Sequence, residues 1–304
     1  MTEKNRVRHF ADVNVSPGNA GPLDLGVAFQ AKVGIAFEEQ YRQLLAHDPG
    51  TRRGDDPEDL HQLRVATRRL RAFLRCARPL LDRDWAESLR AELGWLGGAL
   101  GPARDLDVML ERLRAETALL GEDSGAAQGL LELLEAERAQ AYLAVVEALE
   151  SERYTALLDR LEAAVAPPLS GETTTLAKIW HREVKRMRRT FEALGDEPED
   201  DALHASRIAV KRARYAAELA AHELGRPGAA FVSRAKDLQD VLGDHQDAVV
   251  AEERIRTWAA TASPEGRVAA GRLVQLERGR RAAARAAWPV AWARLDRAAR
   301  KAAP

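Results

Sequence analysis

The chain of 304 residues is long enough for one large domain or two ordinary ones, and its hydrophobic fraction of 46% excludes a disordered protein. Lys plus Arg number 46 and Asp plus Glu number 47, so the chain lacks the cationic excess that is usual in nucleic-acid binders and basic membrane binders. The single cysteine, Cys76, excludes internal disulfides and cysteine-rich metal sites, and its half-apolar surroundings predict a buried core residue.

The first segment, residues 1–22, contains SPGNAGP and no helical periodicity, which predicts a loose leader. It lacks the apolar core of a signal peptide, and no apolar run in the chain reaches the length of a membrane span. We therefore expect a cytoplasmic protein without membrane segments.

The rest of the chain is predicted to be all-α. Ala, Leu, Arg and Glu dominate, aromatic residues reach only 5%, and no segment alternates with period two. Turn-forming residues divide the helical pattern at 47–57, 81–84, 101–102, 121–125, 166–171, 195–201, 225–228, 243–244 and 262–266. The stretch PPLSGETTT at 167–175 is the expected boundary between two halves.

Three sequence blocks occur twice, in the same order and at nearly constant separation. HQLRVATRRLR pairs with HASRIAVKRAR, LGPARD with LGDHQD, and EAERAQ with QLERGR. The pairs begin at His61 and His204, at Leu100 and Leu242, and at Glu135 and Gln275. This pattern predicts an internal duplication. Residues 23–168 and 169–304 should then form two four-helix bundles related by a pseudo-two-fold axis.

The predicted helix 60–81 carries six arginines and no acid. At the helical period, one face collects His61, Arg64, Arg68, Arg71, Arg75 and Arg78, with Arg69 beside them. The opposite face is apolar and can meet a bundle core. Like charges one turn apart repel each other, so a row of this kind indicates an anionic ligand.

Further cationic rows occur in the second half. His204, Arg207, Lys211 and Arg214 repeat the spacing of the first row, with Arg212 beside them, until Glu218 interrupts the row. A second row on helix 176–194 consists of Lys178, Arg182, Lys185 and Arg189. Arg278, Arg281 and Arg285 share a face near the end of the chain, and Arg278 matches Arg138 of the first half. All these residues are candidate anion-binding residues.

The composition of these rows favours a ligand that has phosphates and no bases. Arginine forks donate paired hydrogen bonds to phosphate oxygens, and only Tyr215 lies close enough to offer a stacking ring. Motifs for nucleotide cofactors (GxxxxGK[ST], GxGxxG), zinc (HExxH) and a serine nucleophile (GxSxG) are absent from the sequence. We therefore expect no cofactor, no metal and no catalysis.

Two alternatives remain open at this stage. The same arginines could bind the backbone of RNA or DNA. A phosphoanhydride hydrolase would need a cluster of carboxylates that holds metal ions, which we cannot assemble from the sequence. Asp105 and Asp247 follow the two LG turns, where we expect them to stabilise a helix start and to hold a nearby arginine. The two motif histidines, His61 and His204, could hydrogen-bond between bundles or contact phosphate.

The blocks HxLRVATRRLRA, LGPARDLDV, HxxRIxxKRxRY and LQDVLGDxxD resemble the CHAD family, the conserved-histidine α-helical domain, over about residue 23 to the end. The resemblance implies two four-helix bundles in pseudo-symmetric contact, a basic pore or groove, inorganic polyphosphate as the ligand, and association with polyphosphate granules. By match to the family motif, the binding residues would be His61, Arg64, Arg68, Arg69, Arg71, His204, Arg207, Lys211, Arg212 and Arg214. This chain departs from the pattern at Gln246, where the first copy has Arg104, and at Glu218.

Overall fold

The computed structural model describes residues 22–172 and 174–302. Over this range the protein is all-α, as predicted, with two short 3-10 helices and one isolated β-bridge. The predicted leader lies outside the described residues, apart from Pro22, which begins the first helix. The α-helices are α1 Pro22–Arg53, α2 Pro57–Ala77, α3 Arg83–Ala118, α4 Gln128–Glu150, α5 Glu152–Ala163, α6 Leu176–Glu192, α7 Asp200–Leu219, α8 Ala221–Ala259 and α9 Pro264–Ala302.

Local chemistry explains where α2 begins and where the preceding helix ends. Gly54, with φ of 76°, ends α1, because a left-handed conformation is accessible to glycine at low cost. Asp56 then caps α2 by accepting a hydrogen bond from the backbone N–H of Glu58, and Pro57 occupies the first helical position. The basic row therefore starts one turn after a well-defined helix start.

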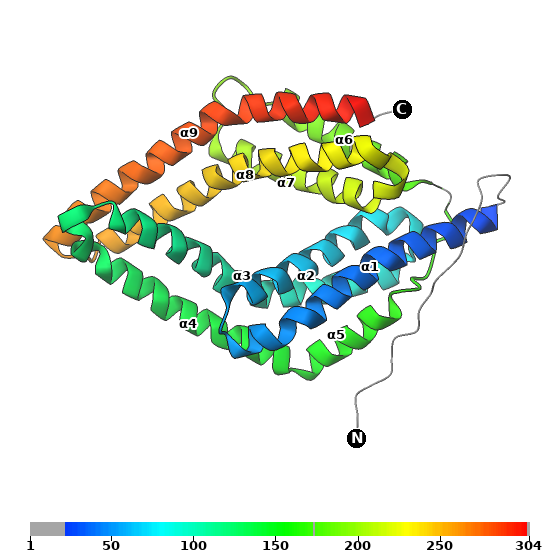
Figure 1. The fold of residues 1–304 in the computed structure, drawn as a ribbon, viewed down its shortest axis with the longest axis horizontal. Coiled ribbons are helices and arrows are strands. Elements are labelled where there is room, and N and C mark those ends of the chain that lie inside the picture. The colour runs from blue at the N-terminus through cyan, green and yellow to red at the C-terminus, as the bar shows by residue number, and fades with distance from the viewer. Residues whose placement is uncertain (1–21, 173, 303–304) are drawn as a thin grey trace.

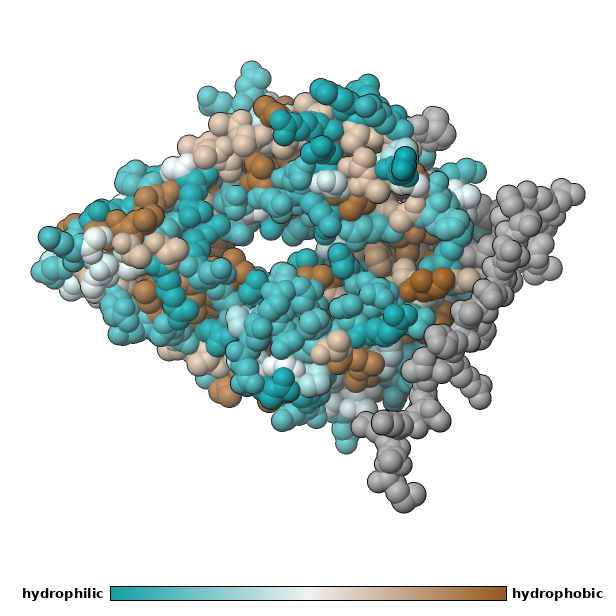
Figure 2. Space-filling view, viewed as in Figure 1, coloured by the Kyte–Doolittle hydropathy of each residue, from teal (hydrophilic) through white to brown (hydrophobic). Residues whose placement is uncertain are grey.

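The helices form two lobes that border a central opening. Figure 1 shows α1, α2 and α5 in one lobe and α6, α7 and α8 in the other, while α3, α4, α8 and α9 extend to a shared end of the molecule. Figure 2 shows that the opening passes through the molecule between the lobes and is edged largely by hydrophilic residues.

Two hydrophobic clusters hold this ring together. The larger one fills both lobes and continues across the contact between α2 and α7. It includes the apolar face predicted for the first basic helix (Leu63, Ala66, Leu70, Leu74, Ala77 and Leu81), and Cys76 is buried in it, as predicted. The smaller cluster joins the far ends of α3 and α4 to those of α8 and α9, for example through Leu113 and Leu273. The lobes therefore meet on both sides of the opening.

Two predicted turns are wrong. α3 continues through Gly101 and Pro102, and α8 continues through Gly243 and Asp244. A proline inside a helix costs on the order of 3 kcal/mol. The cost is tolerated because α3 buries Leu96 and Leu100 in the larger cluster and further leucines in the smaller one. Asp105 and Asp247 therefore lie inside continuous helices and do not start new ones.

Other connections agree with the sequence. The 166–171 segment has no regular helix and is attached to the first lobe, where the Asp82 N–H donates to the Pro168 carbonyl at 2.9 Å. Residues 121–127 form a 3-10 helix, and the chain turns again near 195–199 and 260–263. The break at Ser151, between α4 and α5, was not predicted.

Candidate anion-binding cavity

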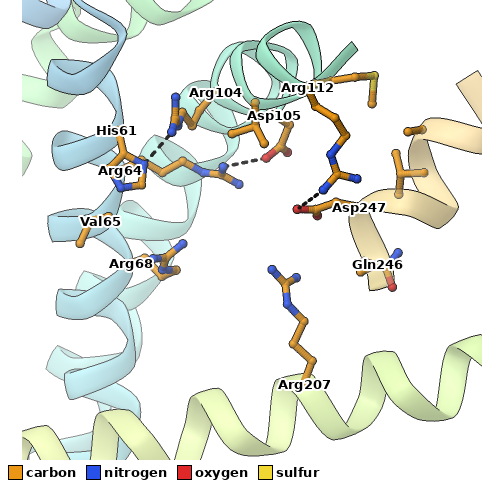
Figure 3. Close-up of a pocket in the computed structure, with 14 residues that line it drawn as sticks. His61, Arg64, Val65, Arg68, Arg104, Asp105, Arg112, Arg207, Gln246 and Asp247 are labelled. Carbon is orange, nitrogen blue, oxygen red and sulfur yellow. Dashed lines mark hydrogen bonds and ion pairs between the residues drawn. The ribbon is translucent and has the colours of Figure 1, made fainter. Parts of the chain in front are cut away.

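A cavity of about 460 Å³ opens between the lobes and is lined by helices from both halves of the chain. α2 and α3 contribute His61, Arg64, Arg68, Arg104 and Arg112, and α7 contributes Arg207. Figure 3 shows these side chains around a common space, with Asp105, Gln246 and Asp247 at its rim. Six basic side chains from two lobes thus converge on one cavity.

The first lobe contributes two ordered pairs. Arg104 Nε donates to His61 Nδ1 at 3.1 Å, and burial together with the Arg104 charge lowers the pKa of His61. The ring is therefore favoured in its neutral form, with its proton on the other nitrogen. Arg64 Nη1 donates to Asp105 Oδ1 at 2.7 Å, so Asp105 holds an arginine, as predicted.

In the second lobe the motif histidine also bonds to the next helix, but its partner is a neutral amide and not an arginine. His204 Nδ1 lies 2.8 Å from Gln246 Oε1, so the carboxamide accepts from the ring where Arg104 donates in the first lobe. Arg207 extends into the cavity and approaches Asp247 of α8. Burial raises the pKa of Asp247, and the Arg207 charge opposes that rise. Both motif histidines thus bond to the next helix of their own lobe, and neither of these bonds joins the two bundles, which was the first role considered for them.

Lys211 of α7 lies close to cations from both lobes. Burial, followed by the charges of Arg207 and Arg68, lowers its pKa to about 8. Arg68 belongs to the other lobe and donates through Nε to the hydroxyl of Tyr215 at 2.8 Å. Lys211 of α7 therefore lies close to Arg207 of its own helix and to Arg68 of α2, whose charges disfavour its protonated form.

The remaining motif cations lie farther along α2 and α7. Glu218 is within 3.6 Å of Arg69 and 3.3 Å of Arg214, so it neutralises one arginine from each lobe. Arg75 lies 3.9 Å from Glu183 of α6, and Arg71 and Arg212 are exposed. Glu218 therefore reduces the positive charge that this part of α2 and α7 can offer to a ligand.

Other predicted binding residues lie away from the cavity. Lys178, Arg182, Lys185 and Arg189 form an exposed row on the face of α6 opposite its buried residues. Arg138 pairs with Asp107, Arg278 lies 3.0 Å from Glu252, and Asp200 binds both Arg281 and Arg285. These last four arginines tie helices together, and their charge is already compensated.

Sequence reasoning missed two residues of the cavity as binding candidates, Arg104 and Arg112. In the sequence, Arg104 stands out only by comparison with Gln246, its counterpart in the second copy. Arg112 follows Arg104 by two helical turns and shares its face of α3, but it is flanked by acids in sequence. A turn at Gly101–Pro102 would redirect the chain before both arginines, so the sequence alone does not place them beside the basic row of α2.

The described part of the chain contains neither a membrane-spanning helix nor a cluster of metal ligands. None of its helices is long and apolar enough to cross a bilayer. No group of three or more His, Cys, Asp or Glu side chains there could hold a metal ion.

Known proteins resemble the chain in both sequence and structure. It is 33% identical over 282 residues to the uncharacterized proteins MT2285 and Rv2226 of Mycobacterium tuberculosis; the match covers 88% of this chain, which spans only 53% of the length of these relatives. PptA from Streptomyces chartreusis superposes with a TM-score of 0.72 at 25% identity, covering 88% of this chain and 98% of PptA. The CHAD domain from the plant Ricinus communis superposes with a TM-score of 0.66 at 26% identity, and the match covers 88% of this chain and 91% of that domain.

A family model, the CHAD domain, matches residues 35–256, which include α2, α3, α7 and nearly all of α8. These four helices line the cavity, and α2, α3 and α7 carry its basic side chains. The chain belongs to the CHAD-domain family.

Proposed function

We propose that the protein binds inorganic polyphosphate in the cavity between its lobes, does not catalyse a reaction on it, and associates through it with polyphosphate granules. The observation that carries the proposal is the convergence of Arg64, Arg68, Arg104 and Arg112 from one lobe with Arg207 and Lys211 from the other. A flexible chain of phosphates can satisfy all these donors at once, because each unit carries charge and offers oxygens that accept paired hydrogen bonds.

The cavity suits phosphates better than bases. Its lining consists of cationic, carboxylate, amide, aliphatic and methionine side chains and one imidazole, that of His61, which accepts from Arg104. Tyr215 is buried with its hydroxyl bonded to Arg68. Single-stranded nucleic-acid sites depend on exposed aromatic faces for stacking. The carboxylates of Asp105 and Asp247 lie beside arginines, which favours a role in ordering those arginines over metal binding.

Titration with polyphosphate at increasing salt tests this function. Each phosphate neutralised by a cation releases counterions, so affinity should fall steeply, with a slope of about −0.7 to −0.9 in log affinity against log salt for each contact. Charge reversal at Arg64, Arg68, Arg207 and Lys211 should abolish binding while the circular dichroism of the helices is retained.

A matched control variant separates the cavity from overall charge. Reversal of Lys178, Arg182, Lys185 and Arg189 changes the net charge by the same amount on the outer face of α6. If this variant loses as much affinity as the cavity variant, the ligand does not select the cavity. RNA that displaces polyphosphate at equal phosphate concentration would favour the nucleic-acid alternative, and release of orthophosphate by the purified protein would contradict the absence of catalysis.

A further inference from the structure

Two buried carboxylates lie beside the cavity where the two halves of the chain join, together with the nearly buried Arg112 and the exposed Arg280. Glu116 of α3 is 1% exposed and Glu277 of α9 is 0% exposed, and they come from different halves. Arg280 Nε lies 2.6 Å from Glu116 Oε1, and Arg112 Nη1 donates to Glu277 Oε2 at 3.4 Å. The second oxygen of Glu277 has no hydrogen-bond partner among the described residues.

Arg112 connects this cluster to the cavity. Its side chain is 11% exposed, lines the cavity, and lies 3.9 Å from Asp244 and 3.8 Å from Asp247 on α8. Figure 3 shows its guanidinium directed at Asp247 across the cavity rim. Arg112 therefore lines the cavity on one side and is held by a carboxylate of the protein interior on the other.

Two adjacent buried carboxylates do not both ionise readily. Burial, and then the charge of Glu116, raise the pKa of Glu277 to about 7, although Arg112 and Arg280 act in the opposite direction. A proton on the pair would also provide the unpartnered oxygen of Glu277 with a hydrogen bond to Glu116. Protonation would leave Arg112 with one carboxylate fewer to neutralise it.

The surroundings supply few other charges to Glu277. α3 presents Arg112 and Glu116, α9 presents Arg280, and α8 presents Asp244 and Asp247 on the outer side of Arg112. α4 contributes Glu137 to a separate ion pair with Arg254 of α8. That pair stands at the positions of the sequence repeat that match Glu277 and Arg112, but Arg254 does not line the cavity.

We propose that Arg112 contacts polyphosphate in the cavity and that the buried pair Glu116–Glu277 positions it, releasing its guanidinium to the ligand when the pair takes up a proton. This inference rests on the proposed function. It makes Arg112 a binding residue and Glu277 a positioning residue. It also means that binding is coupled to proton uptake and is strengthened as the pH falls toward 6.

The experiment measures polyphosphate affinity between about pH 6 and pH 8 for the wild type, Glu277→Gln and Arg112→Gln. Glu277→Gln mimics the protonated carboxyl, so it should bind more tightly than the wild type at pH 8 and show a flatter pH profile. Arg112→Gln should bind about ten-fold more weakly than the wild type near pH 6, since one charged hydrogen-bonded contact is lost, and this difference should shrink toward pH 8, where the ionised pair holds the wild-type guanidinium. His61, Lys211 and Asp247 are retained in all three proteins, so their titration contributes equally.

Glu137→Gln and Arg254→Gln are the matched controls, because they make the same charge changes at the corresponding pair. Equal effects at both pairs, or an unchanged pH profile in Glu277→Gln, would overturn the inference.

Thermal unfolding without ligand gives an independent test of the pair. In the folded protein the pKa of Glu277 lies above its ordinary value of 4.5, so the stability that its protonation contributes is lost as the pH rises toward 7. Between these two pH values the melting temperature of the wild type should therefore fall more than that of Glu277→Gln. Absence of wild-type binding at low salt would instead overturn the function itself.

Discussion

Single residues decide how much positive charge each lobe offers to the cavity. Arg104 and Gln246 occupy matching positions of the sequence repeat and both bond to the motif histidine of their lobe. The first therefore contributes a cation, whereas the second contributes a neutral amide. Glu218 has a similar effect farther along, because it neutralises Arg69 and Arg214. The cavity is consequently more basic on the side of the first lobe.

Exchange of the two matched residues tests this difference. We expect Arg104→Gln to weaken polyphosphate binding and to reduce the salt slope by about one contact, whereas Gln246→Arg should strengthen binding by the reverse effect. Affinity measured at several salt concentrations checks both. Equal affinity in the two variants and the wild type would show that these positions do not face the ligand.

Long helices are the elements that place the basic side chains. α3 and α8 each run from one lobe to the joint far end, and both pass the cavity near their midpoints, where Asp105 and Asp247 lie. α8 is regular only after Gly225, whose φ of 53° turns the chain from the end of α7 into the long helix. The left-handed conformation at this one residue therefore sets the direction of α8.

Substitution of glycine on two helices separates backbone strain from helix propensity. A Cβ at Gly225 would meet no atom within 4 Å, so Gly225→Ala should lower the free energy of unfolding by roughly 1–2 kcal/mol through its backbone conformation alone. Gly271 lies in the regular, exposed part of α9 and is equally unobstructed. Gly271→Ala should therefore raise stability by about 0.5–1 kcal/mol. Denaturant unfolding measures both, and a stabilising Gly225→Ala would contradict this role of the kink.

At the scale of the whole molecule, the ring is closed by a small hydrophobic cluster that no single lobe forms alone. Leu113 of α3 and Leu273 of α9 are both fully buried in it. Two ion pairs also cross between the halves of the chain at this end. Arg112–Glu277 joins α3 to α9, and Arg254–Glu137 joins α8 to α4. Because the cavity is lined from both lobes, this closure keeps its basic side chains within reach of one ligand.

Truncation of this cluster should act on both stability and binding. Leu273→Ala is expected to cost about 2–5 kcal/mol of unfolding free energy and to weaken polyphosphate binding, since the lobes are then held less firmly at this end. Val268→Ala is the control on the same helix, because Val268 is 60% exposed and should change either quantity little. Unchanged affinity in a folded Leu273→Ala protein would show that closure is not needed for binding.

The sequence by itself determined the helical class, the apolar and basic faces of α2, and four of the six basic residues that line the cavity, namely His61, Arg64, Arg68 and Arg207. These features follow from spacing along one helix, where the period of 3.6 residues decides which side chains share a face. The exposed row of α6 follows from spacing in the same way, but spacing could not show that this row lies away from the cavity.

Only the tertiary structure decided which cationic rows meet. Arg138, Arg278, Arg281 and Arg285 resemble the other candidates in sequence, yet acids from distant segments neutralise them, and Arg112 joins the cavity because α3 continues through Pro102. Three-dimensional packing decides which acid pairs with which arginine when the two are far apart in sequence. It also decides whether burying both ends of a long helix stabilises that helix enough to pass a proline. Local propensity does not contain that information, and it therefore misplaced the helix breaks and with them part of the site.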